Sequence, residues 1–138
     1  MHCRLRNELL ELQRLNQEVS TFAELHHFSS EMLHNLILVL EEVVSNIMLY
    51  GYDSAQEDTI DVLLTLQENA VVLEVQDNGV PFNPLDVPDP DIERPLHERE
   101  IGGLGIYLTR TLMDELAYRR EHGKNVLWMK KCLTTKNS

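Results

Sequence analysis

The spacing of apolar side chains changes once along the chain, and this change limits the possible folds more than any other feature. Residues 29–52, SSEMLHNLILVLEEVVSNIMLYGY, carry apolar side chains at helical spacing, which predicts one long buried helix. From residue 60 the spacing becomes two. The alternating runs 60–67 and 71–76, separated by the polar turn QENA, predict a β-hairpin that follows this helix.

The long helix has recognisable ends and a clear apolar stripe. Ser29 or Ser30 can cap its start, and Gly51 suits its C-terminal cap. We expect this helix to cross the core. Its buried stripe is predicted to consist of Met32, Leu36, Val39, Leu40, Val43 and Ile47.

Further elements flank this centre on both sides. Residues 6–27 are predicted to form a helix, and CRLR at 3–6 an edge strand. GLGIYLTRTLMDEL at 103–116 returns to helical spacing, and two strand-like runs follow at 116–121 and 125–133, joined at HGKN. The apolar stripe of the first helix is predicted to be Leu9, Leu12, Val19, Phe22 and Leu25. Because the strands come in pairs without βαβ alternation, we expect an α+β, two-layer α/β sandwich with helices on one face of a mixed or antiparallel sheet.

The bulk composition excludes several functional classes. At 138 residues we expect one domain, 1–138, and a net charge of −11 argues against direct nucleic-acid binding. No apolar run approaches the roughly 18–20 residues that span a bilayer, and the start lacks the apolar centre of a secretory signal. The two cysteines are too few for a disulfide framework, and no Cys/His spacing resembles a zinc site. We therefore expect a cytoplasmic protein that does not bind a membrane.

Three polar or glycine-rich stretches stand out against this background. DNGVPFNP at 77–84 ends a strand, GGLG at 102–105 opens a helix, and Glu42 and Asn46 lie one helical turn apart beside the apolar stripe. Each has an ordinary explanation: a turn, a close helix-to-sheet contact, or the polar rim of an amphipathic helix. The stretch 78–101 lacks periodicity and holds all five prolines, which is typical of a lid or binding loop.

Taken together, the three stretches resemble the motifs of the histidine-kinase-like ATPase superfamily, which includes gyrase and the histidine kinases. EEVVSN resembles the N box, DNGVPF the first glycine box and GGLGIYL the second, in the same order along essentially the whole chain. The small size, SNIMLYGY and GGLGIYLTRTLMDEL are most similar to anti-sigma regulatory factors that act as serine-protein kinases. The resemblance implies a Bergerat-type fold, bound ATP and Mg²⁺, and an ATP lid at about 80–101.

The resemblance also implies roles for the residues of the adenine side. Asp77 corresponds to the acid that accepts a hydrogen bond from the adenine amino group. Gly79 lets the backbone approach the base, and Phe82 belongs to the same nucleotide-binding box.

On the phosphate side, the resemblance makes Asn46 the ligand of Mg²⁺. It makes Glu42 the catalytic carboxylate that takes the proton from the attacking hydroxyl or orients it. Arg99 is the first choice to meet the γ-phosphate, and Arg94 is the second. The backbone that holds the phosphates corresponds to Gly102, Gly103, Leu104 and Gly105.

Two positions depart from the family pattern. Tyr50 stands where these kinases commonly have histidine, and HGKNV replaces a Gly-Thr pair whose threonine reaches the adenine region, a contact for which Asn125 could substitute. The function implied is an ATP-dependent serine/threonine-protein kinase that phosphorylates an anti-sigma-factor antagonist and, in the family, also sequesters a sigma factor. The alternative is a nucleotide-binding module that sequesters a partner without kinase activity. The resemblance also makes a homodimer plausible, through the N-terminal strand and first helix.

Overall fold

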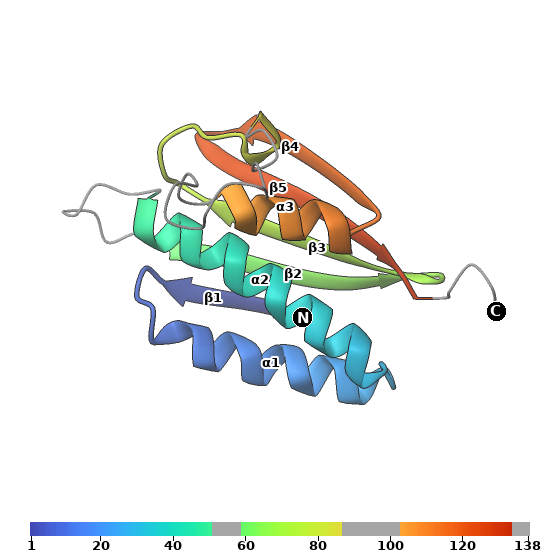
Figure 1. Cartoon of the computed structure of the whole chain (residues 1–138). Coiled ribbons are helices and arrows are strands. Elements are labelled where there is room, and N and C mark those ends of the chain that lie inside the picture. Colours follow the sequence, from blue (N-terminus) through green and yellow to red (C-terminus); the bar gives the residue numbers. More distant parts are fainter. Residues whose placement is uncertain (51–58, 87–102, 134–138) are drawn as a thin grey trace.

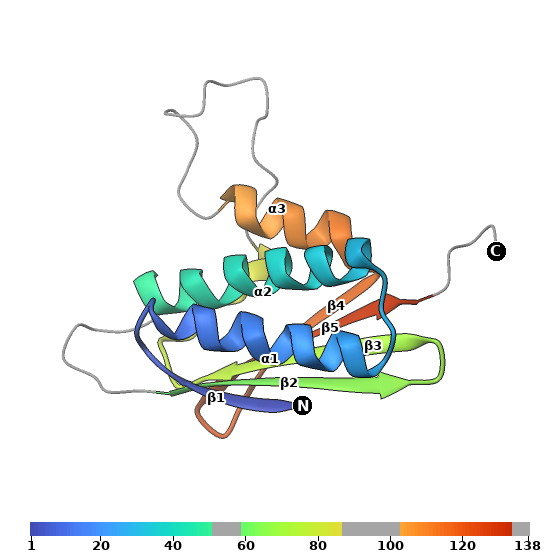
Figure 2. The same ribbon diagram turned by 90° about the horizontal axis from the view of Figure 1, so that it is seen from below.

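Five strands form one sheet, and the helices lie on one of its faces (Figures 1 and 2). The computed structural model describes residues 1–50, 59–86 and 103–133. The elements of these residues are β1 (His2–Arg6), α1 (Glu11–Leu25), α2 (Ser30–Tyr50), β2 (Thr59–Gln67), β3 (Ala70–Asp77), the short 3₁₀ helix η1 (Pro84–Asp86), α3 (Gly103–Leu112), β4 (Glu115–Glu121) and β5 (Lys124–Cys132). The predicted two-layer sandwich with helices on one face is confirmed.

The sheet has the strand order β1-β2-β3-β5-β4, and every neighbouring pair is antiparallel. The sequence left open whether the sheet is mixed or antiparallel, and the described strands form an antiparallel sheet. β3 is the central strand, and its last residue, Asp77, lies opposite Ile60 of β2 and Asn125 of β5. The β4–β5 turn consists of His122 and Gly123, with φ of 52° and 76°, as a two-residue hairpin loop requires.

Helix α2 lies over the sheet as its sequence predicts. Ser29 is the capping residue, because its Oγ accepts a hydrogen bond of 3.0 Å from the backbone N–H of Met32. Of the predicted stripe, Leu36, Val39, Leu40 and Val43 are buried, and Met32 and Ile47 are partly buried against the same core. Val44 is buried as well, although the predicted stripe did not include it. By length and composition alone, residues 30–49 could cross a membrane, at a mean hydropathy of 1.5. In this fold, however, the helix supplies the middle of the core.

The first helix differs from its prediction at both ends and in its stripe. It begins at Glu11 and ends at Leu25, so it is shorter than the predicted 6–27. The prediction that Leu9 and Leu25 are buried is wrong, since they are 51% and 70% exposed. The side chains that α1 buries are Leu15, Val19, Phe22 and Ala23.

The third helix ends four residues earlier than the sequence predicts. Helical spacing continues to residue 116, but α3 stops at Leu112 and β4 already starts at Glu115. Asp114 changes the direction of the chain here, because its N–H donates to the carbonyl of Lys130 and its carboxylate accepts from the N–H of Cys132 at 2.6 Å. Pairing with β5 therefore outweighs the local helical pattern.

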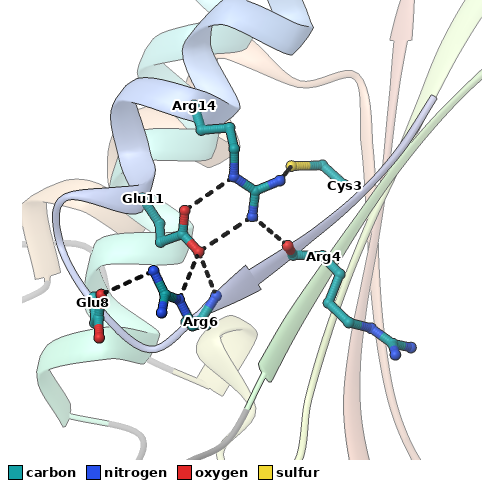
Figure 3. Close-up of polar contacts among 6 residues, drawn as sticks. All are labelled: Cys3, Arg4, Arg6, Glu8, Glu11 and Arg14. Carbon is teal, nitrogen blue, oxygen red and sulfur yellow. Dashed lines mark hydrogen bonds and ion pairs between the residues drawn. The ribbon is translucent and has the colours of Figure 1, made fainter.

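The connection from β1 to α1 is held by a group of charged side chains around Glu11 (Figure 3). The Glu11 carboxylate accepts hydrogen bonds from the backbone N–H of Arg6 at 3.0 Å and from Nε of Arg14 at 3.0 Å. Arg14 also donates to the carbonyl of Arg4 and contacts the sulfur of Cys3. Glu11 thus links strand, turn and helix through one carboxylate.

The pKa values of Glu11 and of the neighbouring Cys3 are both shifted. Hydrogen bonds from Arg14 and from the Arg6 backbone lower the pKa of Glu11 to about 2. Burial, together with a hydrogen bond to Glu18, raises the pKa of the Cys3 thiol to about 12, so this thiol stays protonated at neutral pH. Because the folded-state pKa of Glu11 lies below its ordinary value, the resulting stability is present above about pH 4.5 and is lost as the pH falls toward 2.

We expect Glu11→Gln to lower the free energy of unfolding by about 1–2 kcal/mol at pH 7, because the charged acceptor of several hydrogen bonds is lost. The deficit should shrink between about pH 4.5 and pH 2, where the wild-type carboxylate becomes protonated. Urea unfolding followed by circular dichroism at several pH values measures both effects. Glu8→Gln is the matched control, because Glu8 makes only a 3.7 Å ion pair with the exposed Arg6 and should change little. Equal losses in the two variants would contradict the role given to Glu11.

Candidate nucleotide site

The segments singled out in the sequence lie at one end of the molecule. Figure 1 shows the C-terminal half of α2, the end of β3 and the start of α3 on the same side of the fold, and the view in Figure 2 agrees. α2 and α3 pack side by side over the sheet. The chain therefore brings an acidic strand end, a polar helix edge and a glycine-rich helix start to one region.

The polar edge of α2 follows directly from its apolar stripe. Glu42 and Asn46 are both half-buried and one turn apart, and the buried Val43 lies next to Glu42 in the core-facing stripe. Their place beside the core is therefore fixed by the packing of the same helix. A carboxylate and a carboxamide at such a position are held by the helix and remain accessible enough to contact a ligand.

The residues that end β3 form a tight, hydrogen-bonded turn, named here the Asp77 turn (residues 77–82). Asp77 is buried, at 5% exposure, and its Oδ1 accepts a hydrogen bond of 2.8 Å from the backbone N–H of Gly79. The same oxygen accepts a second bond of 3.1 Å from Nδ2 of Asn125 on β5. The carboxylate is thus held in one orientation at the end of the central strand.

Three side chains hold this turn and the segment after it, and of these the sequence singled out only Asn125, as a possible adenine contact. Asn125 contacts it from β5, Arg120 donates from β4 to the carbonyl of Gly79 at 3.0 Å, and Arg110 donates from α3 to the carbonyl of Leu85. Asn83 caps the start of η1, since its Oδ1 accepts a hydrogen bond of 2.9 Å from the backbone N–H of Leu85. No local pattern marks the two arginines, because their partners are main-chain carbonyls on distant segments.

The remaining predicted residues are placed only in part. Gly103, Leu104 and Gly105 form the first turn of α3, the position from which backbone N–H groups can meet an anion. Phe82 is 53% exposed beside the Asp77 turn. Arg94, Arg99 and Gly102 lie outside the described residues, as do residues 87–101 of the lid predicted at about 80–101.

Among the described residues, Asn46 offers an oxygen ligand of the kind that magnesium takes. Within residues 1–50, 59–86 and 103–133, no group of three or more His, Cys, Asp or Glu side chains could hold a metal ion. Asn46 offers one half-buried amide oxygen on the edge of α2. Mg²⁺ commonly takes one or two protein oxygens and completes its shell with phosphates and water, so this residue fits that ion.

Residues 5–131 match the model of the histidine kinase-like ATPase domain family. The chain belongs to that family.

Similar proteins include several serine-protein kinases. The chain is 29% identical to the serine/threonine-protein kinase BtrW of Bordetella bronchiseptica over 72% of its own length and 70% of that protein. It is 31% identical to the serine-protein kinase RsbW of Bacillus mycoides, over 75% of its own length and 66% of that protein. It is 27% identical to the serine-protein kinase RsbW of Listeria monocytogenes, over 89% of its own length and 80% of that protein. These relatives carry the kinase names that the sequence resemblance implied.

A solved structure shows the same fold at low sequence identity. The crystal structure of the RsbU and RsbW domains of a Mycobacterium tuberculosis protein superposes with a TM-score of 0.67 and 12% identity, covering 98% of this chain and 32% of that one. The agreement extends to the histidine-kinase domain of the Erythrobacter litoralis blue-light-activated kinase, with a TM-score of 0.54 over 91% of this chain.

We expect Arg110→Ala to speed hydrogen exchange at the backbone N–H groups of Leu85 and Asp86 by at least about tenfold, because η1 loses its charged link to α3. Exchange in β2 and β3 should not change. Exchange mass spectrometry with peptide resolution measures this. Arg119→Ala is the control, since Arg119 pairs with Glu74 and Glu121, away from η1. Unchanged exchange at η1 would show that the arginine does not hold it.

Proposed function

We propose that this chain is an ATP-dependent serine/threonine-protein kinase that transfers the γ-phosphoryl group to a hydroxyl of a small partner protein. The observation that carries the proposal is the fixed, buried Asp77 carboxylate, which ends β3. This end of β3 lies on the same side of the fold as the C-terminal half of α2 and the start of α3 (Figure 1). Membership in the ATPase family and the names of the kinase relatives support it.

Adenine recognition rests on the Asp77 turn. The carboxylate accepts a hydrogen bond from the 6-amino group of adenine, whereas guanine presents an oxygen acceptor at the same position and is repelled. Gly79 keeps the backbone close to the base, and Phe82 offers an exposed ring beside it. The site should therefore prefer ATP to GTP.

Phosphoryl transfer uses the helix edge and the start of α3. The backbone N–H groups at Gly103–Gly105 hold phosphate oxygens, and a lid arginine, with Arg99 preferred to Arg94, meets the γ-phosphate. Asn46 would hold Mg²⁺, which neutralises phosphate charge when bound. Glu42 accepts the proton of the attacking hydroxyl. At the same time the hydroxyl oxygen bonds to the γ-phosphorus, and the bond between this phosphorus and the leaving ADP oxygen breaks.

A second function remains in competition with the kinase. The chain would bind nucleotide as a structural ligand and sequester a partner without transfer. Tyr50 at the usual histidine position and the net charge of −11 favour this alternative. Labelled γ-phosphate on a partner protein, or its absence, separates the two.

The partner and the setting are inferred from the same relatives. We propose an anti-sigma-factor antagonist as the phosphate acceptor, a sigma factor as a second partner, and the cytoplasm as the location. β1 is the edge strand of the sheet, and we propose that it forms the interface of a homodimer together with α1.

We expect calorimetric titration to detect ATP binding and no comparable GTP binding, with Mg²⁺ strengthening the affinity for ATP. In Asn46→Ala the dependence on Mg²⁺ should disappear, because the amide oxygen that holds the ion is lost. Asn69→Ala, an exposed change at the β2–β3 turn, is the control. If the wild type binds neither nucleotide, the proposed function fails.

We expect Glu42→Gln to keep its affinity for ATP while phosphoryl transfer to the partner falls by at least about 100-fold, the usual contribution of a positioned base. The neighbouring Glu41→Gln is a matched control, since Glu41 accepts a hydrogen bond of 2.7 Å from Asn16 on α1 instead. The assay uses γ-labelled ATP and the co-purified partner. Transfer at the wild-type rate in Glu42→Gln would remove Glu42 from the mechanism.

A further inference from the structure

Asn125 lies at the centre of the hydrogen bonds that hold the Asp77 turn. Its side-chain nitrogen donates to Oδ1 of Asp77 at 3.1 Å and to the carbonyl of Val80 at 2.8 Å. Its side-chain oxygen accepts from the N–H of Phe82 at 3.3 Å and from the hydroxyl of Tyr118 at 2.5 Å. Asn125 itself is only 7% exposed.

The partners determine which way the amide faces. The Phe82 N–H can only donate and the Val80 carbonyl can only accept, so the oxygen must face Phe82 and the nitrogen must face Val80. A carboxamide has two donor hydrogens and two acceptor lone pairs, and all four are used within the protein. Asn125 therefore has no group left with which to contact a base directly.

This count changes the role expected from the sequence. The sequence left open that Asn125 itself reaches the adenine region. The structure instead makes Asn125 a link between the last hairpin, β4–β5, and the turn that carries the adenine-binding acid. Its effect on a nucleotide must pass through the Asp77 turn, which it contacts at Asp77, Val80 and Phe82.

We propose that Asn125 is a positioning residue that sets the purine selectivity of the site by fixing the orientation of the Asp77 carboxylate. This inference rests on the proposed ATP-binding function. Few other side chains can replace the amide, because the position needs two donors toward Asp77 and Val80 and an acceptor toward Phe82 and Tyr118. Aspartate would place a second carboxylate against Asp77, and alanine would leave buried groups without partners.

The role of Tyr118 follows from the same geometry. Its hydroxyl holds the amide oxygen of Asn125, so the ring braces the orientation of the amide from the neighbouring strand. Tyr118→Phe removes only that hydroxyl and keeps the packing of the ring. It is therefore a milder version of the same disturbance, and it covers the case in which a change at Asn125 fails to fold.

The test compares ATP with purine riboside triphosphate, which is identical except that it lacks the 6-amino group. We expect the wild type to bind ATP at least about tenfold more tightly, since the amino group bonds to a charged acceptor. In Asn125→Ala this ratio should fall toward one, and in Tyr118→Phe it should fall part of the way. Asn69→Ala should keep the wild-type ratio. Titrations are made at a temperature at which thermal melting shows each variant to be folded.

The outcomes separate this inference from the proposed function. If the wild type fails to bind ATP or to favour it, the proposed function is wrong. If the wild type discriminates and Asn125→Ala and Tyr118→Phe discriminate equally well, Asn125 has only a structural role and the inference is overturned. A weaker affinity for both ligands with an unchanged ratio counts as the same negative result, because a purely structural change lowers both affinities alike.

Discussion

The packing of α2 across the sheet is the constraint on which the other features depend. Its buried side chains belong to the same core cluster as those of β2, β3 and β5, and α1 and α3 contact it from either side. Because side chains follow one another at about 100° around a helix, burying this stripe also fixes the polar flank. Glu42 and Asn46 therefore keep their positions as long as Leu40, Val43 and Val44 stay buried. The packing of α2 therefore contributes to the stability of the fold and also determines the positions of these two site residues.

Much of the fold was readable from the sequence because local rules and tertiary packing agree there. The period of α2, the serine at its start and the alternation of β2 and β3 each predict the element that forms. The errors lie where distant partners decide. Helical spacing runs past Leu112, yet two hydrogen bonds between Asp114 and β5 end the helix. Leu9 and Leu25 are apolar but lie beyond the buried part of α1.

The candidate site divides in the same way. Glu42, Asn46, Asp77 and the glycines belong to short motifs whose spacing is visible along the chain. The contacts that hold the Asp77 turn cannot be recognised from such spacing, because they join residues of different strands across the sheet. Asn125 and Asp77 are 48 residues apart and become neighbours only through the pairing of β3 with β5. No sequence motif identifies Arg120, since its partner is the main-chain carbonyl of Gly79.

The strand order also sets a sequence of events during synthesis. β5 pairs directly with the central strand β3 although the chain builds η1, α3 and β4 between them. At ribosomal rates the 48 residues from Asp77 to Asn125 take roughly 2–10 s to be added. Throughout that interval the residues of α2, β2 and β3 have been synthesised, whereas Asn125, which holds the Asp77 carboxylate, has not. A ligand that needs this acid in place cannot assist early folding and meets a complete site only when the last strand has docked.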